Sequence, residues 1–159
     1  ESGRIDAAEF RRIIRPHLPQ GTTDLAIDRA FCEFLVGIPV RRLVALRDLR
    51  RQGLGVYMLS NTNPIMWNSK IGEEFGREGL RREDYFDGMV TSFEARVMKP
   101  APEIFNYAGE QLGIAPDETL FLDDGEANVC AAEALGWHAA LVRPGVEFDA
   151  LLRDMGVCK

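Results

Sequence analysis

The segment Glu118–Asn128 reads ETLFLDDGEAN and joins a short apolar run to two adjacent aspartates. The run has the length and composition of a buried strand, and the residues from Glu126 onward have the spacing of a helix. Two carboxylates at the end of a buried strand are costly unless they bind something positive. Oxygen ligands of this kind suit Mg²⁺, which makes Asp123 and Asp124 candidate magnesium ligands. The alternative is that Asp124 only caps the helix, which explains one aspartate better than two.

Working outward, the chain from Gly53 onward alternates short apolar runs with amphipathic segments. Strands are predicted at residues 55–59, 88–91, 119–122 and 138–142, and helices at 65–78, 102–112, 126–135 and 146–155. This alternation predicts an α/β fold of Rossmann-like type, in which a parallel sheet has helices on both faces. Ligands of such sheets bind at the carboxyl ends of the strands.

The first third of the chain has a different pattern. Helices are predicted at residues 6–17, 22–36 and 40–51, with a boundary at Gly37-Ile38-Pro39, where a proline suits the first turn of a new helix. Residues 1–52 contain ten arginines and seven acidic residues, a net charge of +3, whereas residues 53–159 have a net charge of −9. We therefore expect two structural units, residues 1–38 and 39–159. The arginines of the third helix have the spacing of a solvated helix face.

Polar residues also follow the other two strands. Ser60 and Asn61, in Leu59–Pro64 (LSNTNP), offer donors to an anion at a strand-to-helix turn. Such residues are also ordinary turn and cap residues. Lys99 precedes two prolines that begin the next helix, where its ammonium group is placed to neutralise a phosphoryl group or an aspartate; the alternative is a surface lysine.

The composition restricts the class of protein. The chain has 159 residues, a net charge of −6 and three cysteines without metal-ligand spacing. The acidic balance argues against nucleic-acid binding, and the cysteine pattern fits a reducing compartment. No signal peptide and no apolar run long enough for a membrane span is visible. We expect a cytoplasmic protein that does not bind membranes and is a monomer or weak dimer.

Taken together, three segments resemble the haloacid dehalogenase-like (HAD) hydrolase superfamily, in its sugar-phosphatase-like branch with a small helical cap. LSNTNP resembles the second motif of that family, KPAPEIF (Lys99–Phe105) the third, and ETLFLDDGEANVCAAEALGWH (Glu118–His138) the fourth with its following helix. ESGRIDAAEF, at the start of the chain, resembles a cap segment. The resemblance covers nearly the whole chain, so residues 1–38 are expected to be part of a helical cap.

The resemblance implies a Mg²⁺-dependent phosphatase that acts on small phosphorylated metabolites, with a sugar phosphate as first choice, through an aspartyl-phosphate intermediate. By that pattern Ser60 and Asn61 hold the transferring phosphoryl group, Lys99 neutralises its charge, and Asp123 ligates the metal with Asp124 as second ligand or outer partner. These roles agree with the needs of phosphoryl transfer, which are positioning and charge neutralisation.

One motif of the superfamily is missing. Its first motif is an Asp-x-Asp pair on a central strand, which supplies the nucleophile, and no two aspartates of this chain are spaced i and i+2. We expect the core, residues 39–159, to lack this first strand, which would leave two inner strands with unpaired backbone groups. The expected reason is that the chain is a fragment, and the chain alone is predicted to be inactive. The alternatives are a 2-haloacid dehalogenase, which needs no metal, and a non-catalytic binding or scaffold protein.

Overall fold

Two pairs of parallel strands form the centre of the molecule. The computed structural model describes all 159 residues. β1 (Tyr57–Ser60) pairs with β2 (Gly88–Thr91), and β3 (Leu120–Asp123) pairs with β4 (His138–Leu141). The two pairs are not hydrogen-bonded to each other. The predicted α/β class with parallel strands is confirmed.

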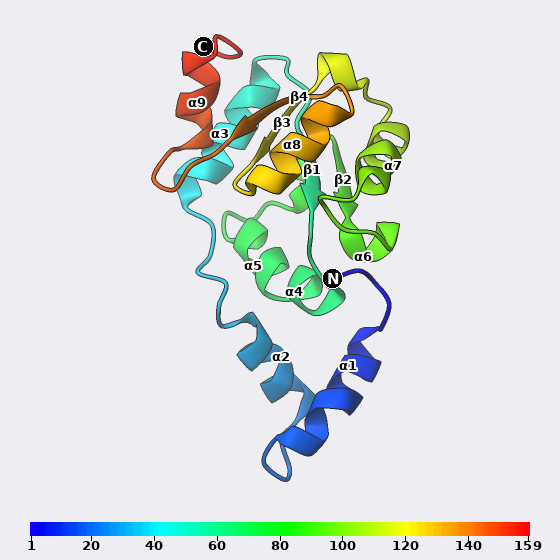
Figure 1. The fold of residues 1–159 in the computed structure, drawn as a ribbon. Helices are drawn as coiled ribbons and strands as arrows, with labels where there is room; N and C mark the ends of the chain where they lie inside the picture. Colours follow the sequence, from blue (N-terminus) through cyan, green and yellow to red (C-terminus); the bar gives the residue numbers. More distant parts are fainter.

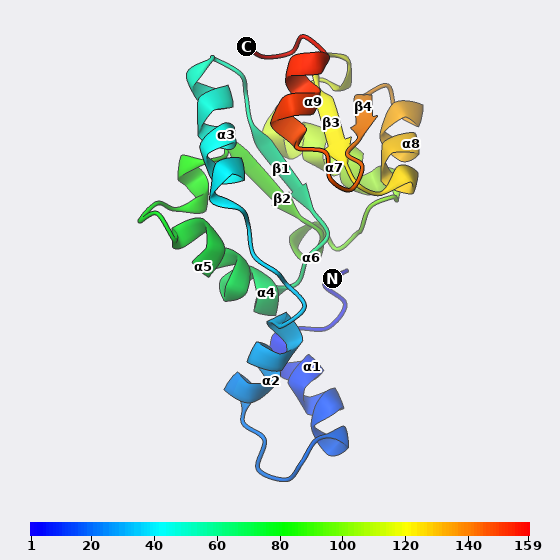
Figure 2. The same ribbon diagram turned by 90° about the vertical axis from the view of Figure 1, so that its left-hand side faces the viewer.

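Helices surround the strands, and a pair of helices extends away from them (Figures 1 and 2). The α-helices are α1 (Ala7–Ile14), α2 (Asp24–Cys32), α3 (Val40–Arg51), α4 (Pro64–Asn68), α5 (Lys70–Gly76), α6 (Ser92–Ala95), α7 (Pro102–Leu112), α8 (Glu126–Ala134) and α9 (Phe148–Asp154). Three short 3₁₀ helices are η1 (Arg15–His17), η2 (Arg82–Asp84) and η3 (Pro116–Glu118).

The side chains of β1 and β3 alternate between two hydrophobic clusters, one on each face of the strands. Met58, Leu120 and Leu122 pack against the cluster that contains Leu43 and Leu49 of α3. Leu59 and Phe121 face the opposite cluster, which contains residues of α7 and α8. Successive residues of a strand point to opposite faces, so this alternation means that β1 and β3 lie in one layer with the same two faces.

Three predicted helices differ from the structure. The helix predicted at 65–78 is broken at Ser69, which has φ −117° and ψ −101° and whose hydroxyl donates to the Ile65 carbonyl at 2.6 Å. A hydroxyl bound to the carbonyl four residues earlier is known to bend helices. The helix predicted at 22–36 ends at Cys32, and the one at 6–17 tightens into η1 where Pro16 enters.

The α1–α2 pair is held together by its own contacts. Phe10 and Phe31 stack with ring centroids 4.7 Å apart, and Arg11 forms a bidentate ion pair with Asp28. The pair rests on α4 and α5 through Cys32, which packs among Ile65 and Met66. No helix of the structure is long and apolar enough to cross a lipid bilayer.

Candidate functional site

The carboxyl ends of β1 and β3 are connected by a buried ion pair. The ammonium group of Lys99 lies 2.7 Å from a carboxylate oxygen of Asp123 and donates to the Leu59 carbonyl at 2.8 Å. The two charged side chains are only 9% and 7% exposed. An ammonium group has three donors, so one N–H of Lys99 remains for a further acceptor. The structure therefore brings together two of the predicted site residues from different strands.

Asp123 is held on both of its oxygens. While one oxygen faces Lys99, the other accepts from the Gly125 amide and from the Asn128 side chain, each at 2.8 Å. Burial acts to raise the pKa of Asp123, but the hydrogen bonds from Lys99, Asn128 and Gly125 outweigh it, so the pKa lies below its ordinary value. Asp123 is therefore a fixed anion.

Asn128 is a site residue that the sequence analysis missed. It lies in the first turn of α8, and its amide reaches back to the end of β3. The segment DDGEAN contained the signal that could have identified Asn128. A polar residue in the first turn of a helix lies close to the end of the strand that precedes the helix.

Asp124 differs from its neighbour. Its side chain is exposed, whereas the ion pair and the hydrogen bonds at this strand end all go to Asp123. The two adjacent carboxylates are thus unequal: one is tied into the protein, and the other is open to solvent and to a ligand.

Asn61 binds the backbone of Lys99. Its side-chain oxygen accepts from the Lys99 amide at 2.9 Å, and its side-chain nitrogen donates to the Lys99 carbonyl at 3.0 Å. The side chain thereby fastens the segment that carries the lysine to the end of β1. A direct bond from Asn61 to a phosphoryl group stays a prediction, and the geometry found here gives the residue a positioning role.

Ser60 and the loop after it complete this edge. Ser60 is the last residue of β1, is half-buried and pairs in register with Thr91. Beyond it, the Thr62 hydroxyl and the Asn63 side-chain nitrogen are buried without a hydrogen-bond partner. A buried donor without a partner costs about 1–3 kcal/mol, so these atoms indicate that a further polar group belongs next to the loop.

The donor set at this edge fits a magnesium ion in part. Mg²⁺ is usually bound through one or two carboxylates, with water and substrate phosphate as the other ligands. Asp124 provides one open carboxylate, and the Asp123 oxygens are occupied by other donors. No group of three or more His, Cys, Asp or Glu side chains in the chain would hold a metal ion by itself. The residues present therefore fit a magnesium ion that takes further ligands from outside this set.

A cavity of about 1060 Å³ separates β1 from β3. Residues of both strands line it, together with residues of α3, α7 and α9, and twenty of its thirty lining residues are hydrophobic. Asp123 and Asp124 lie in the lining, so the cavity reaches the carboxyl edge of the strands. The inner edges of β1 and β3 have no strand partner there.

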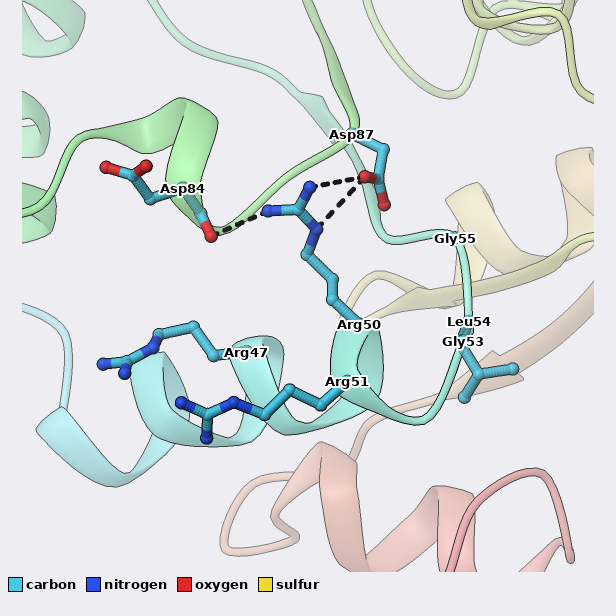
Figure 3. A pocket seen from close by; sticks show the side chains of 8 residues that line it. All are labelled: Arg47, Arg50, Arg51, Gly53, Leu54, Gly55, Asp84 and Asp87. Atoms are coloured by element: carbon cyan, nitrogen blue, oxygen red, sulfur yellow. Dashed lines mark hydrogen bonds and ion pairs between the residues drawn. The ribbon is translucent and has the colours of Figure 1, made fainter.

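A second pocket lies on α3 and is lined by arginines, but it belongs to the scaffold (Figure 3). Arg50 donates twice to the Asp87 carboxylate and once, at 2.8 Å, to the Asp84 carbonyl. Arg51 pairs with Asp48 on the same helix. The predicted solvated helix face is thus wrong for Arg50, which joins α3 to the start of β2.

This fold and this edge define the class of the protein. Residues 11–136 match the family of haloacid dehalogenase-like hydrolases, and the chain belongs to that family, as the resemblance predicted.

Particular relatives agree. The chain is 32% identical over 148 residues to D-ribitol-5-phosphate phosphatase of Bacteroides thetaiotaomicron. The aligned region covers 93% of this chain and 71% of that protein. A HAD family enzyme of the same organism, solved with magnesium and inorganic phosphate, superposes with a TM-score of 0.89 at 39% identity over 96% of this chain and 76% of that one. A predicted HAD-like hydrolase from Porphyromonas gingivalis gives a TM-score of 0.88 at 30% identity, over 100% of this chain and 77% of that one.

Proposed function

We propose that the chain carries the phosphate-binding and metal-binding half of a Mg²⁺-dependent phosphatase for small phosphorylated metabolites. The observation that carries this proposal is the buried Lys99–Asp123 pair, with the open carboxylate of Asp124 beside it. A fixed cation and an open anion at one sheet edge suit a phosphate monoester and its metal ion.

Each residue at the edge has a task in this reaction. The free N–H of Lys99 binds a phosphoryl oxygen, and the Ser60 hydroxyl donates to another. Asp123 keeps the lysine charged and in place, while Asn61 and Asn128 hold Lys99 and Asp123 respectively. Asp124 would hold the magnesium ion, and Asp123 would act behind it, the reverse of the order that the resemblance implied. When bound, the ion supplies positive charge that stabilises the transferring phosphoryl group.

We further propose that the cavity between β1 and β3 takes an extended polypeptide segment that supplies the nucleophile. A single strand between them would offer backbone partners to both inner edges, which have no strand partner in this chain. It would be apolar on both faces and parallel to β1, since the layer is covered on both sides.

The carboxyl end of that strand would reach Lys99. An aspartate there would face the free ammonium donor, and its attack on phosphorus would form an acyl phosphate as the substrate's ester P–O bond breaks. By the resemblance, the second aspartate of an Asp-x-Asp pair would give the leaving alcohol its proton and take one back from the attacking water. Water would then release phosphate and regenerate the carboxylate. Residues 1–159 contain no Asp-x-Asp pair, so we expect no turnover from this chain alone.

Peptide complementation tests this proposal. The purified chain is assayed on p-nitrophenyl phosphate with Mg²⁺, alone and with a synthetic peptide of about ten residues in which an apolar run precedes Asp-x-Asp. We expect activity only when the Asp-x-Asp peptide is present. The unfolding temperature of the chain is expected to rise with this peptide and also with a matched control peptide that ends in Asn-x-Asn. Activity of the chain alone, or no stabilisation by either peptide, would refute it.

The metal ligand has its own test. Asp124→Asn is expected to raise the Mg²⁺ concentration needed for half-maximal complemented activity by about tenfold or more. Glu126→Gln, an exposed acidic neighbour, is the matched control and is expected to leave it unchanged. Full activity in the presence of EDTA would contradict the metal-ligand assignment, and metal-independent hydrolysis of a 2-haloacid would instead favour the dehalogenase alternative.

A polyol phosphate or sugar phosphate is the proposed substrate class. The similarity to D-ribitol-5-phosphate phosphatase supports it, over 71% of that protein's length. We propose that the protein acts in the cytoplasm as a monomer or weak dimer. A panel of phosphorylated polyols and sugars, compared by kcat/KM, tests the substrate class.

A further inference from the structure

Two chain segments connect the α1–α2 pair to the rest of the molecule (Figure 2). One is the N-terminal segment, where the Glu1 carbonyl accepts from the buried Ser92 hydroxyl at 2.8 Å. The other is the linker from α2 to α3, residues 33–39. How firmly the linker is held decides where the helical pair stands relative to the site edge.

Both polar backbone groups of Ile38, in the linker, are bound by side chains of α5 and of Arg77, the residue that follows it. The Ile38 amide donates to the Glu74 carboxylate at 2.9 Å, and the Ile38 carbonyl accepts from the Arg77 guanidinium. Arg77 and Lys70 also pair with Glu74, at 3.1 and 3.4 Å. Glu74 is only 8% exposed, although charged side chains are rarely buried unless they are paired. We call Glu74 and Arg77 the linker clamp.

Gly37 permits the close approach that the clamp needs. Its φ is +92°, and a Cβ at this position would lie 2.9 Å from a Glu74 carboxylate oxygen. A side chain here would therefore meet both a disfavoured backbone conformation and the buried carboxylate. Pro39, which follows Ile38, is the N-cap residue of α3 and has non-helical backbone angles, so the linker ends there.

The clamp is joined to the site through a short path. α5 follows α4 after Ser69, and α4 is capped at its start by Asn63, whose side chain accepts from the amides of Ile65 and Met66. The same two residues form the surface on which Cys32 of α2 rests. The linker clamp and the α2 contact therefore fix the helical pair to the loop that follows Ser60.

We propose that Glu74 is a positioning residue that sets the place of the α1–α2 pair against the loop that follows Ser60 and thereby the affinity for substrate. This rests on the proposed function, in which the site edge binds a phosphorylated metabolite. Glu74 lies outside that edge and contacts no residue to which a chemical role has been given, so it acts on binding through the linker.

Hydrogen exchange tests the clamp without any need for activity. In Glu74→Gln and in Gly37→Ala, the Ile38 amide is expected to exchange about tenfold to a hundredfold faster than in the unaltered chain. An acceleration of this size is expected when an amide loses its hydrogen bond to a charged group. The matched controls are Glu73→Gln, an exposed neighbour, and Gly21→Ala, a glycine with φ +85° that faces open space. An exchange rate of the Ile38 amide that is the same in the variants and in the controls would refute the proposal that Glu74 holds the linker.

Kinetics test the positioning role in the chain complemented by the Asp-x-Asp peptide. Glu74→Gln is expected to raise KM about fivefold or more while kcat changes less than about twofold, and Glu73→Gln is expected to change neither. An unchanged KM, or a fall in kcat at constant KM, would overturn the positioning role. Because Ile38 exchange is measured separately, absence of all turnover would count against the proposed function and not against the clamp.

Discussion

Replacement of Lys99 with methionine removes the cation from a buried pair and leaves the Asp123 charge behind. The two side chains are 9% and 7% exposed, so solvent screens the remaining charge little. Loss of one partner of such a pair typically costs about 3–5 kcal/mol. Asp123 keeps the hydrogen bonds from Gly125 and Asn128, so we expect the lower end, about 3 kcal/mol, in the free energy of unfolding.

The double variant Lys99→Met with Asp123→Asn separates the pair from its parts. It leaves no uncompensated charge, and the methionine would lie near Phe121, whose ring centroid is 5.4 Å from the Lys99 ammonium group. We expect it to be destabilised by about 1 kcal/mol, less than either single variant, which corresponds to a coupling energy above about 3 kcal/mol.

Urea unfolding at neutral pH measures these values. With a slope of about 2 kcal/mol per molar, Lys99→Met should lower the midpoint by about 1.5 M. Lys159→Met, at the exposed end of the chain, is the control and should shift the free energy by less than about 0.5 kcal/mol. A Lys99→Met loss below about 1 kcal/mol, or additive single variants, would refute the view that the pair is a tightly coupled unit.

Three further predictions concern other contacts. Asn128→Ala should lower the free energy of unfolding by about 1–3 kcal/mol and reduce complemented phosphatase activity, since it removes a donor from the buried aspartate; unchanged activity would contradict the positioning role of Asn128. Arg50→Ala should destabilise the chain by about 1–2 kcal/mol in the same urea assay because it frees Asp87, whereas exposed Arg51→Ala should cost less than about 0.5 kcal/mol. The pKa of Glu74 lies below its ordinary value of 4.5, chiefly because its carboxylate accepts a hydrogen bond from the Ile38 amide. The charged form therefore stabilises the folded chain at neutral pH, and this stabilisation is lost as the pH falls through the lowered pKa. The difference in unfolding free energy between the unaltered chain and Glu74→Gln should therefore shrink on acidification below 4.5, and a difference that grows would contradict the assignment.

The main parts of the fold and the site edge were predictable because they depend on local pattern. The apolar run before Asp123 and the polar turn after Leu59 each marked a strand end, and parallel strands bring such ends to one edge. That Lys99 belongs to the same edge also followed from its place before the helix that begins at Pro102.

What pattern did not predict depends on side-chain hydrogen bonds across the fold. The break at Ser69 arises from a hydroxyl that competes for a backbone carbonyl, and apolar spacing does not contain this information. The orientation of Asn61 toward the Lys99 backbone joins segments 38 residues apart. The clamp on Ile38 needs a buried Glu74, and nothing in its sequence neighbourhood separates it from the exposed Glu73.

The two aspartates differ in their surroundings. β3 ends at Asp123, which bonds to Lys99, whereas Asp124 follows outside the strand and has an exposed side chain. Asp123 faces inward and has a cation and two further donors, and a carboxylate used in this way has little capacity left for a metal ion. Asp124 is exposed, so its oxygens are open to solvent and to a ligand. Under the proposed function, two adjacent aspartates suit this edge better than one, because Asp123 orders the lysine and Asp124 stays free for a magnesium ion.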